Sequence, residues 1–361
     1  YDELFRNRGL SVIFEKRGVN KNNLQSIVET LEAIINTYDD CHFDLTGGDE
    51  LYLAAMGIVF ERYKDKNINM HRYSIFANKL FDCDGNGETI LFEKLPEMTV
   101  SENIRLYGGE IINAELTYSD TTDINTDITN DINTLWRICC KDQRVWNNNV
   151  SNLERLVCEA KADSSGLSFS VTEKQYSYLT KSDEMTDFVK KLTEEGLIVI
   201  EKKPDTIRVK YKNRYVKSCL EKSGKILELK IFVLAKDLIN EDGNKIYNDT
   251  MSGITIDWDG VISRDVPNTE NEIDIILMHG VIPVFISCKN GQADVNELYK
   301  LNTVAQTFGG QYSRKVLIAG SSLVLSKAVK RRAADMGVGI ISSVHNLSDE
   351  VLSERLSALW K

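Results

Sequence analysis

Two pairs of polar side chains in the C-terminal third of the chain have the types and the spacing that phosphodiester chemistry needs. Glu272 and Asp274 are two residues apart, and so are Ser287 and Lys289. Side chains two residues apart on a strand point to the same face of a sheet. Carboxylates gathered in this way bind Mg²⁺ or Mn²⁺, which can activate water and neutralise a phosphate under attack. The two pairs therefore predict metal-dependent hydrolysis.

The segments that carry these pairs are predicted to form one β-hairpin. Both segments are largely apolar, and only residues 279–280 separate them, which suits a two-residue hairpin turn. In that hairpin Met278 pairs with Val281, and Glu272 lies opposite Ser287. Residues that oppose each other share a face, so the hairpin would bring both polar pairs together. The alternative is an edge hairpin whose polar face meets water.

Neighbouring residues complete the predicted catalytic and metal-binding set. Lys289 would orient the attacking water or stabilise developing negative charge, as a compact ammonium does well. The backbone carbonyl of Cys288 is a further candidate ligand, and Glu228 on the preceding predicted helix would add a third carboxylate. The predicted catalytic residues are Glu228, Glu272, Asp274, Ser287 and Lys289, and the predicted metal ligands are Glu228, Glu272, Asp274 and Cys288.

The elements around this site indicate an α/β protein of three domains, with boundaries at 1–115, 116–215 and 216–361. From Gly224 onward the pattern predicts helix, strand, strand, helix, strand, helix and strand. The first domain alternates strands and helices, which favours a Rossmann-like parallel sheet. Its predicted elements are a strand at 10–14, a helix at 22–38, a strand at 42–45, a helix at 50–64 and a strand at 69–76.

The middle of the chain begins with a tract at 118–133 that is rich in Thr, Asp and Asn. Such residues favour turns, so the tract predicts a domain boundary. A helical stretch at 135–158, a helix at 183–195 and a strand pair at 197–202 and 206–211 follow. Helices followed by a basic two-stranded ribbon resemble a winged helix; a structural connector between domains is the alternative.

Composition limits what the protein can be. A formal charge of −10 argues against a surface that binds nucleic acid everywhere, so such binding would need local basic patches. Two patches are present, one at 202–217 and one at 327–332. Seven cysteines without a CxxC pair are typical of a reducing cytoplasm. The longest apolar stretch, 275–288, is too short for a membrane helix, which needs about 20 residues.

Seven short motifs together resemble the CRISPR-ancillary nucleases that join a CARF ligand-sensing domain to a PD-(D/E)xK nuclease domain, over nearly the whole chain. The motifs are Leu45-Thr46-Gly47-Gly48, Tyr107-Gly108-Gly109, Gly224-Lys225-Ile226-Leu227-Glu228, Asn271-Glu272-Ile273-Asp274, Ser287-Cys288-Lys289, Leu298-Tyr299-Lys300-Leu301 and Met336-Gly337-Val338.

This resemblance implies a cytoplasmic homodimer that binds a cyclic oligoadenylate, typically cyclic tetra-adenylate, and then cleaves DNA, RNA or both with Mn²⁺ or Mg²⁺ in type III CRISPR antiviral defence. It places Thr46, Gly47, Gly48 and Asp49 at the ligand, where glycines let backbone N–H groups approach a phosphate. It also implies that the first strand of the sensor precedes Tyr1, so we expect the chain to be incomplete at that end.

One residue departs from the family pattern. The family has an acid where Ser287 stands, and a hydroxyl is a much weaker ligand for a hard cation than a carboxylate. Two other functions therefore stay open: a ligand-responsive DNA-binding regulator with an inactive nuclease fold, and a ring nuclease that degrades the cyclic oligoadenylate.

Overall fold

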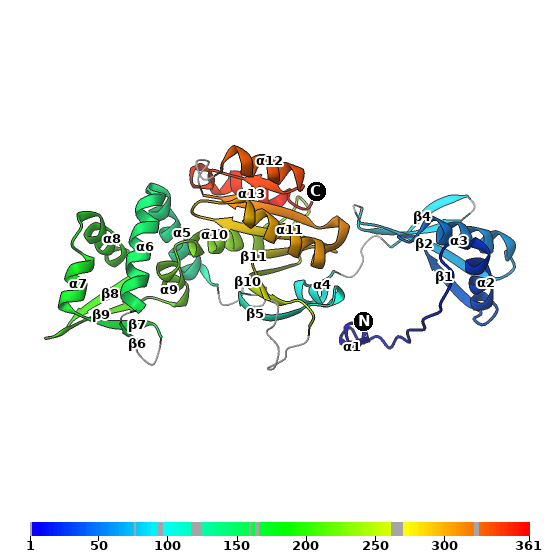
Figure 1. The fold of residues 1–361 in the computed structure, drawn as a ribbon, viewed down its shortest axis with the longest axis horizontal. Coiled ribbons are helices and arrows are strands. Elements are labelled where there is room, and N and C mark those ends of the chain that lie inside the picture. Colours follow the sequence, from blue (N-terminus) through cyan, green and yellow to red (C-terminus); the bar gives the residue numbers. More distant parts are fainter. Residues whose placement is uncertain are drawn as a thin grey trace. The chain divides into compact units, whose positions relative to one another are not determined.

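The computed structural model describes residues 2–75, 77–84, 86–92, 97–116, 124–158, 160–162, 166–260, 270–320 and 325–361. The chain divides into an N-terminal unit, Tyr1–Glu97, and a larger unit, Met98–Trp360. Both contain helices and sheets (Figure 1), which confirms the mixed α/β class. Each unit is described by itself.

The N-terminal unit is a four-stranded sheet, in the order β1-β2-β3-β4, with α2 and α3 packed together over a small apolar core. Asn23 and Asp49 begin these two helices by accepting hydrogen bonds from backbone N–H groups of the first turn, a typical N-cap. The elements are α1 (Asp2–Asn7), α2 (Leu24–Ile35), β1 (Asp40–Asp44), α3 (Glu50–Arg62), β2 (Asn67–Ser74), β3 (Lys79–Asp84) and β4 (Gly87–Phe92).

The prediction of a parallel sheet was right for one pair of strands only. β1 and β2 are parallel, but β2–β3 and β3–β4 are antiparallel, because short turns rather than helices connect them. The strand predicted at 10–14 is absent, since these residues have no regular structure and pair with no strand. The other predicted elements are present, and Phe76 lies outside the described residues.

The larger unit is built on a six-stranded sheet in the order β14-β13-β12-β11-β10-β5. One face packs against α4, α11 and α12, and the other packs against α10, α13 and α5. Its elements are α4 (Val100–Leu106), β5 (Glu110–Leu116), α10 (Lys225–Lys236), β10 (Asp249–Asp257), β11 (Glu270–His279), β12 (Ile282–Lys289), α11 (Val295–Gly309), η2 (Gly310–Tyr312), β13 (Arg314–Ala319), α12 (Lys327–Asp335), β14 (Gly339–Ile341), η4 (Val344–Asn346) and α13 (Asp349–Ser357).

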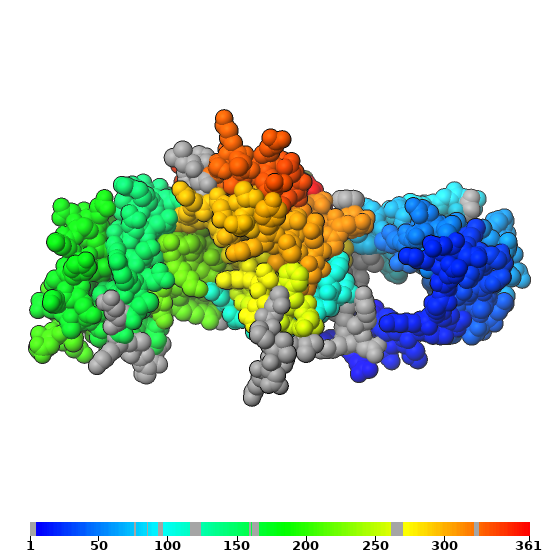
Figure 2. Space-filling model, in the orientation of Figure 1, coloured from blue at the N-terminus to red at the C-terminus, as the bar shows by residue number. Residues whose placement is uncertain are grey.

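The structure moves the first domain boundary from residue 115 to residue 97. β5 pairs with β10 along most of its length, and α4 packs its Val100 and Ile104 into the core of the larger unit. Segment 98–116, cyan in Figure 2, lies against β10 in yellow. The sequence placed it in the first domain because β10, the strand that β5 pairs with, was itself not predicted.

The middle elements share a core with the six-stranded sheet. They are α5 (Thr126–Lys141), α6 (Gln143–Cys158), β6 (Lys161–Ala162), β7 (Ser168–Thr172), α7 (Glu173–Leu179), α8 (Asp183–Glu194), β8 (Ile198–Lys202), β9 (Thr206–Tyr211) and α9 (Arg214–Glu221), with strand order β6-β7-β9-β8. Leu135 of α5, Val150 of α6 and Val216 of α9 belong to one apolar cluster with Ile226 of α10. These elements and the sheet therefore form one body.

The polar tract predicted as turns is helical from Thr126 onward; residues 118–123 lie outside the described part. Asn125 accepts a hydrogen bond from the N–H of Ile128, so a turn-forming residue acts here as a helix N-cap. Ile132 and Leu135 then face the core. The polar composition hid an amphipathic helix with a narrow apolar stripe.

The central hairpin is formed by β11 and β12, but its register differs from the prediction by two residues. His279 pairs with Ile282, and Met278 pairs with Pro283, so the turn is Gly280-Val281. Gly280 has a φ of +60°, which the first position of a type II′ turn requires and which glycine adopts without strain. A two-residue shift by itself moves no side chain to the other face, and Ile275 to Met278 alternate as predicted. The alternation breaks at Asp274, because Ile273 packs in the same cluster as Ile276 and not with Ile275.

Among the described residues, no helix combines the length and the apolar character needed to cross a membrane. All seven cysteines are described, and none forms a disulfide.

The tight join between α4 and β5 yields a prediction. A Cβ on Gly109 would lie 2.5 Å from Cε1 of Phe308 and 3.1 Å from the carbonyl oxygen of Asp257. We expect Gly109→Ala to destabilise the larger unit by about 1–3 kcal/mol, because overpacking displaces a buried ring. Urea unfolding followed by tryptophan fluorescence measures this, since all four tryptophans lie in this unit.

Gly291→Ala is the control, because an added Cβ there meets no atom within 4 Å. Equal unfolding midpoints for Gly109→Ala and Gly291→Ala would contradict the packing of segment 98–116 against Phe308.

Candidate functional site

The central hairpin opens at Asp274, and this opening creates the candidate active site. Paired residues of β11 and β12 run from His279–Ile282 as far as Ile275–Ile286. At the next position the Oδ2 of Asp274 accepts a hydrogen bond of 2.6 Å from the N–H of Cys288 and one of 3.3 Å from the hydroxyl of Ser287. A side-chain carboxylate thus satisfies a backbone donor where the two strands separate.

Asp274 lies opposite Ser287, not opposite Phe285 as predicted, because of the two-residue shift. Burial raises the pKa of Asp274. The N–H of Cys288, the Lys289 ammonium and the Ser287 hydroxyl act against this rise, whereas the charge of Glu272 adds to it. Asp274 is therefore a carboxylate whose negative charge needs a nearby cation.

Glu228 joins this site from the first turn of α10. Its side chain is 15% exposed, and its Oε2 lies 2.6 Å from the Nζ of Lys225. Burial raises the pKa of Glu228 to about 7; Lys225 opposes the rise, and repulsion from Asp274 adds to it. The charge of Asp274 is close enough to influence the protonation of Glu228.

Lys289 reaches the site from the end of β12. Its Nζ lies 2.8 Å from the Oε2 of Glu297 on α11. Burial lowers the pKa of Lys289, but the hydrogen bond to Glu297 and the charge of Asp274 outweigh it, so the net pKa is raised. The raised pKa holds Lys289 as an ammonium.

Two predicted members of the site contribute less than expected. Glu272 is exposed, and the structure records only its electrostatic effect on Asp274. Cys288 contributes its backbone N–H, while its thiol is buried and has a pKa raised well above the usual range, chiefly by burial. Within the described ranges, no three His, Cys, Asp or Glu side chains are arranged to hold a metal ion.

The donor set still suits a hard divalent cation. Glu228 and Asp274 are oxygen donors with little access to water; burial raises the pKa of both, and repulsion from Asp274 adds to the rise for Glu228. Ser287, which is 8% exposed, adds a hydroxyl beside Asp274. Mg²⁺ and Mn²⁺ are commonly held by one or two carboxylates and keep waters of their own. Glu228 and Asp274 are therefore the ligands that we would assign.

The sequence missed two charged residues of the site. Lys225 lies three residues before Glu228, an i,i+3 spacing that predicts an ion pair on a helix, so a signal for it was present. Glu115 on β5 also pairs with Lys225. No local pattern could reveal this contact, because 109 residues lie between Glu115 and Lys225 in the sequence. The pairing of β5 with β10, which no motif indicated, is what places Glu115 there.

Side chains of α6 hold the chain directly after Lys289. The carbonyl oxygen of Asn290 accepts hydrogen bonds from Gln143 and, at 2.7 Å, from Asn147. The Nδ2 of Asn290 donates to the carbonyl of Ser223, at 3.1 Å, just before α10. Asn290 thereby ties the end of β12 to the start of the helix that carries Glu228.

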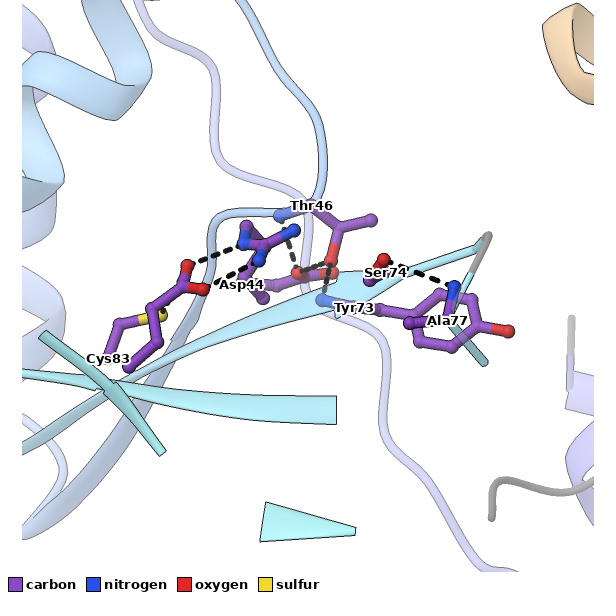
Figure 3. A network of polar contacts seen from close by, with 8 residues as sticks. Asp44, Thr46, Tyr73, Ser74, Ala77 and Cys83 are labelled. Carbon is purple, nitrogen blue, oxygen red and sulfur yellow. Dashed lines mark hydrogen bonds and ion pairs between the residues drawn. The ribbon is translucent and has the colours of Figure 1, made fainter. Parts of the chain in front are cut away.

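The predicted ligand loop, Thr46-Gly47-Gly48-Asp49, follows β1 and leads into α3 in the N-terminal unit. All four residues are exposed. Thr46 accepts a hydrogen bond of 2.9 Å from the N–H of Tyr73 and contacts Asp44 through both its N–H and its hydroxyl (Figure 3). Gly48 has a φ of +127°, which favours glycine. The loop is thus fixed at Thr46 and open at its glycines.

The first predicted basic patch is partly paired within the protein. Lys212 pairs with Asp131 at 2.6 Å, and Lys217 pairs with Glu221 at 3.7 Å. On α8, Asp183, Glu184 and Asp187 are exposed; these acids would repel a phosphate backbone. The second patch lies on α12, where residues 327, 330, 331 and 332 are exposed.

The raised pKa of Glu228 predicts a pH dependence of stability without metal. An acid whose pKa is higher in the folded state favours unfolding as pH rises from its ordinary value toward the folded one. Between pH 4.5 and about 7, we expect Glu228→Gln to gain stability relative to the wild type, by up to about 3 kcal/mol. Thermal and urea unfolding in EDTA, at steps across this range, measure the difference.

Glu241→Gln removes an exposed carboxylate just after α10. It shows how much the loss of one surface charge by itself changes the free energy of unfolding. If Glu228→Gln and Glu241→Gln differ from the wild type by the same amount at every pH, Glu228 is not the buried acid described above.

The fold is shared with solved structures of low sequence identity. The crystal structure of protein VC1899 from Vibrio cholerae matches 99% of this chain and 86% of its own length, with a TM-score of 0.71 and 17% identity. The structure of Can2 from Sulfobacillus thermosulfidooxidans in complex with cyclic tetra-adenylate matches 99% of this chain and 87% of its own, with a TM-score of 0.62 and 14% identity. No protein-family model and no curated protein sequence matches the chain. The architecture of the whole chain is therefore that of these two proteins.

Proposed function

We propose that the protein is a metal-dependent endonuclease that a cyclic oligoadenylate switches on, as a CARF-domain effector of type III CRISPR defence. The observation that carries the proposal is the opened hairpin, where Asp274, Ser287 and Lys289 meet Glu228 of α10. The shared fold with Can2, which was solved with cyclic tetra-adenylate, supports the choice of activator.

In this proposal each residue has a separate task. Asp274 and Glu228 would hold Mn²⁺ or Mg²⁺, which supplies an activated water and charge neutralisation when bound. Lys289, kept charged by Glu297, would stabilise the negative charge that develops on the phosphate. Ser287 orients Asp274 through its hydroxyl. Because Ser287 orients a carboxylate, the site does not need an acid at that position.

The ligand loop would receive the activator. Exposed backbone N–H groups at Gly47 and Gly48, next to the first turn of α3, suit a phosphate. The proposed assembly is a homodimer that binds one cyclic tetra-adenylate, and the proposed substrates are DNA, RNA or both. A ligand can shift the protein toward an active state only by its higher affinity for that state.

The site assignment predicts loss of cleavage without loss of ligand binding. Asp274→Asn and Lys289→Met should each reduce cleavage by at least about a hundredfold, the scale of losing one preorganised charge. Cleavage of supercoiled plasmid and of single-stranded RNA, with Mn²⁺ and cyclic tetra-adenylate, measures it. Affinity for the cyclic nucleotide should not change, because these residues belong to the larger unit.

Glu241→Gln again serves as the control and should cleave at the wild-type rate. Wild-type cleavage by Asp274→Asn would exclude this active site. Loss of the cyclic nucleotide from the wild type without metal, and without cleavage of long substrates, would instead support a ring nuclease.

The loop geometry predicts that Thr46→Val weakens ligand binding but not metal binding, the reverse of what we expect for Asp274→Asn. Removing the hydroxyl leaves the N–H of Tyr73 without its partner at Thr46 and leaves Asp44 with only the backbone N–H of residue 46 from this loop position, so the loop should lose part of its fixed start. We expect about tenfold weaker binding of cyclic tetra-adenylate, as for a lost hydrogen bond to a charged group, and unchanged Mn²⁺ binding. Isothermal titration calorimetry measures both, and Thr46→Ser, which keeps the hydroxyl, should bind like the wild type. Equal affinities for Thr46→Val and Thr46→Ser would remove this loop from the ligand site.

A further inference from the structure

We propose that Lys225 is the internal counter-cation of the candidate active site, that Glu115 holds it there, and that a bound divalent cation takes Glu228 from it. Lys225 and Glu115 are positioning residues in this scheme, since they act through Glu228. The inference rests on the proposed metal-dependent function. It concerns how the buried charges of that site are balanced when no metal is bound.

The first observation is the burial of the Lys225 ammonium. The side chain is 4% exposed, yet its Nζ contacts both the Oε2 of Glu115 and, at 2.6 Å, the Oε2 of Glu228. A buried ammonium needs such partners, because leaving one ion of a buried pair alone is costly. Two carboxylates from different elements, β5 and α10, therefore share one cation.

The second observation is a row of residues that runs straight across the sheet. The β5–β10 register pairs Ile254 with Ala114 and Ser252 with Leu116, so Gly253 stands opposite Glu115. The β10–β11 register likewise places Gly253 opposite Asp274. Asp274 in turn bonds Ser287 on β12. Glu115 and Asp274 thus flank one glycine.

Gly253 is what lets Glu115 reach the site. Its φ is +62°, and a Cβ there would lie 2.6–2.9 Å from three carbon atoms of the Glu115 side chain. The Glu115 chain therefore lies over the glycine, in the space that a side chain at position 253 would fill. A side chain that crosses a strand in this way has its carboxylate fixed beside Lys225.

These contacts define a competition between two cations for Glu228. Without metal, the ammonium is shared by Glu228 and Glu115 and balances buried negative charge. A divalent cation that binds Glu228 and Asp274 repels the ammonium, which keeps Glu115 as its partner. Neither the lysine nor the carboxylates are left unpaired in either state, so the exchange needs no unfolding of the site.

The competition predicts opposite effects of Lys225→Met with and without metal. In EDTA the variant should melt below the wild type, because Glu228 and Glu115 lose their cation. Added Mn²⁺ should raise its melting temperature more than that of the wild type, and Mn²⁺ should bind about tenfold more tightly, since one nearby like charge is gone. Calorimetry and the electron paramagnetic resonance signal of free Mn²⁺ measure the affinity without any activity assay.

Glu115→Gln tests the role of the second carboxylate. It leaves Lys225 with Glu228 as its one charged partner among the contacts described above, so Mn²⁺ should bind about tenfold more weakly. Glu115→Asp should restore part of the affinity. In the double variant Lys225→Met/Glu115→Gln the effect of position 115 should be smaller than in the wild-type background, which a double-mutant cycle measures.

The outcomes separate this inference from the proposed function. If Mn²⁺ does not bind the wild type, or binds Asp274→Asn equally well, the metal site itself is wrong. If Mn²⁺ binding depends on Asp274 but Lys225→Met loses the same stability with and without Mn²⁺, Lys225 is only structural and the inference fails. Should Lys225→Met not fold, unchanged Mn²⁺ affinity in Glu115→Gln overturns the inference in the same way.

Discussion

The structure of the larger unit depends on how a few buried carboxylates are balanced. Asp274 lies where β11 and β12 separate, and it replaces a backbone partner for the N–H of Cys288. Glu228 lies close enough for the two charges to repel. Burying both carboxylates would be unfavourable without nearby cations. Lys225 of α10 and Lys289 of β12 supply the positive charges. In the proposed function, the same excess of negative charge would attract a divalent cation.

Distant parts of the chain supply the charges of this site. β5 brings Glu115, α10 brings Lys225 and Glu228, and α11 brings Glu297 to Lys289. Helix α6, although far from these residues in sequence, fixes Asn290 next to Lys289. The middle helices and the six-stranded sheet share one apolar core. A movement of the middle helices would therefore also displace the end of β12.

The shared fold and the local chemistry support different parts of the proposal. Likeness to VC1899 and Can2 over nearly the whole chain establishes the architecture, and at 14–17% identity it establishes nothing about particular residues. The proposed chemistry depends on Asp274, Glu228 and Lys289. The proposed activator depends on the loop at Thr46, whose glycines are open and whose first residue is held by Tyr73 and Asp44.

The sequence by itself determined which side chains share a face of the hairpin between Ile275 and the turn. Alternation along strands has a period of two, so moving the turn from 279–280 to Gly280-Val281 changed every partner there but no face. The alternation breaks at Asp274, because Ile273 packs in the same cluster as Ile276 and not with Ile275; Asp274 still lies beside Ser287 and within the influence of Lys289. Glu228 was a candidate from the sequence because its predicted helix comes before the hairpin in the chain. The position of the turn, the assignment of 98–116 to the larger unit, and the contact between Glu115 and Lys225 were decided by tertiary structure alone. The last two depend on β10, whose pairing with β5 is a long-range contact that leaves no periodic signal in either segment.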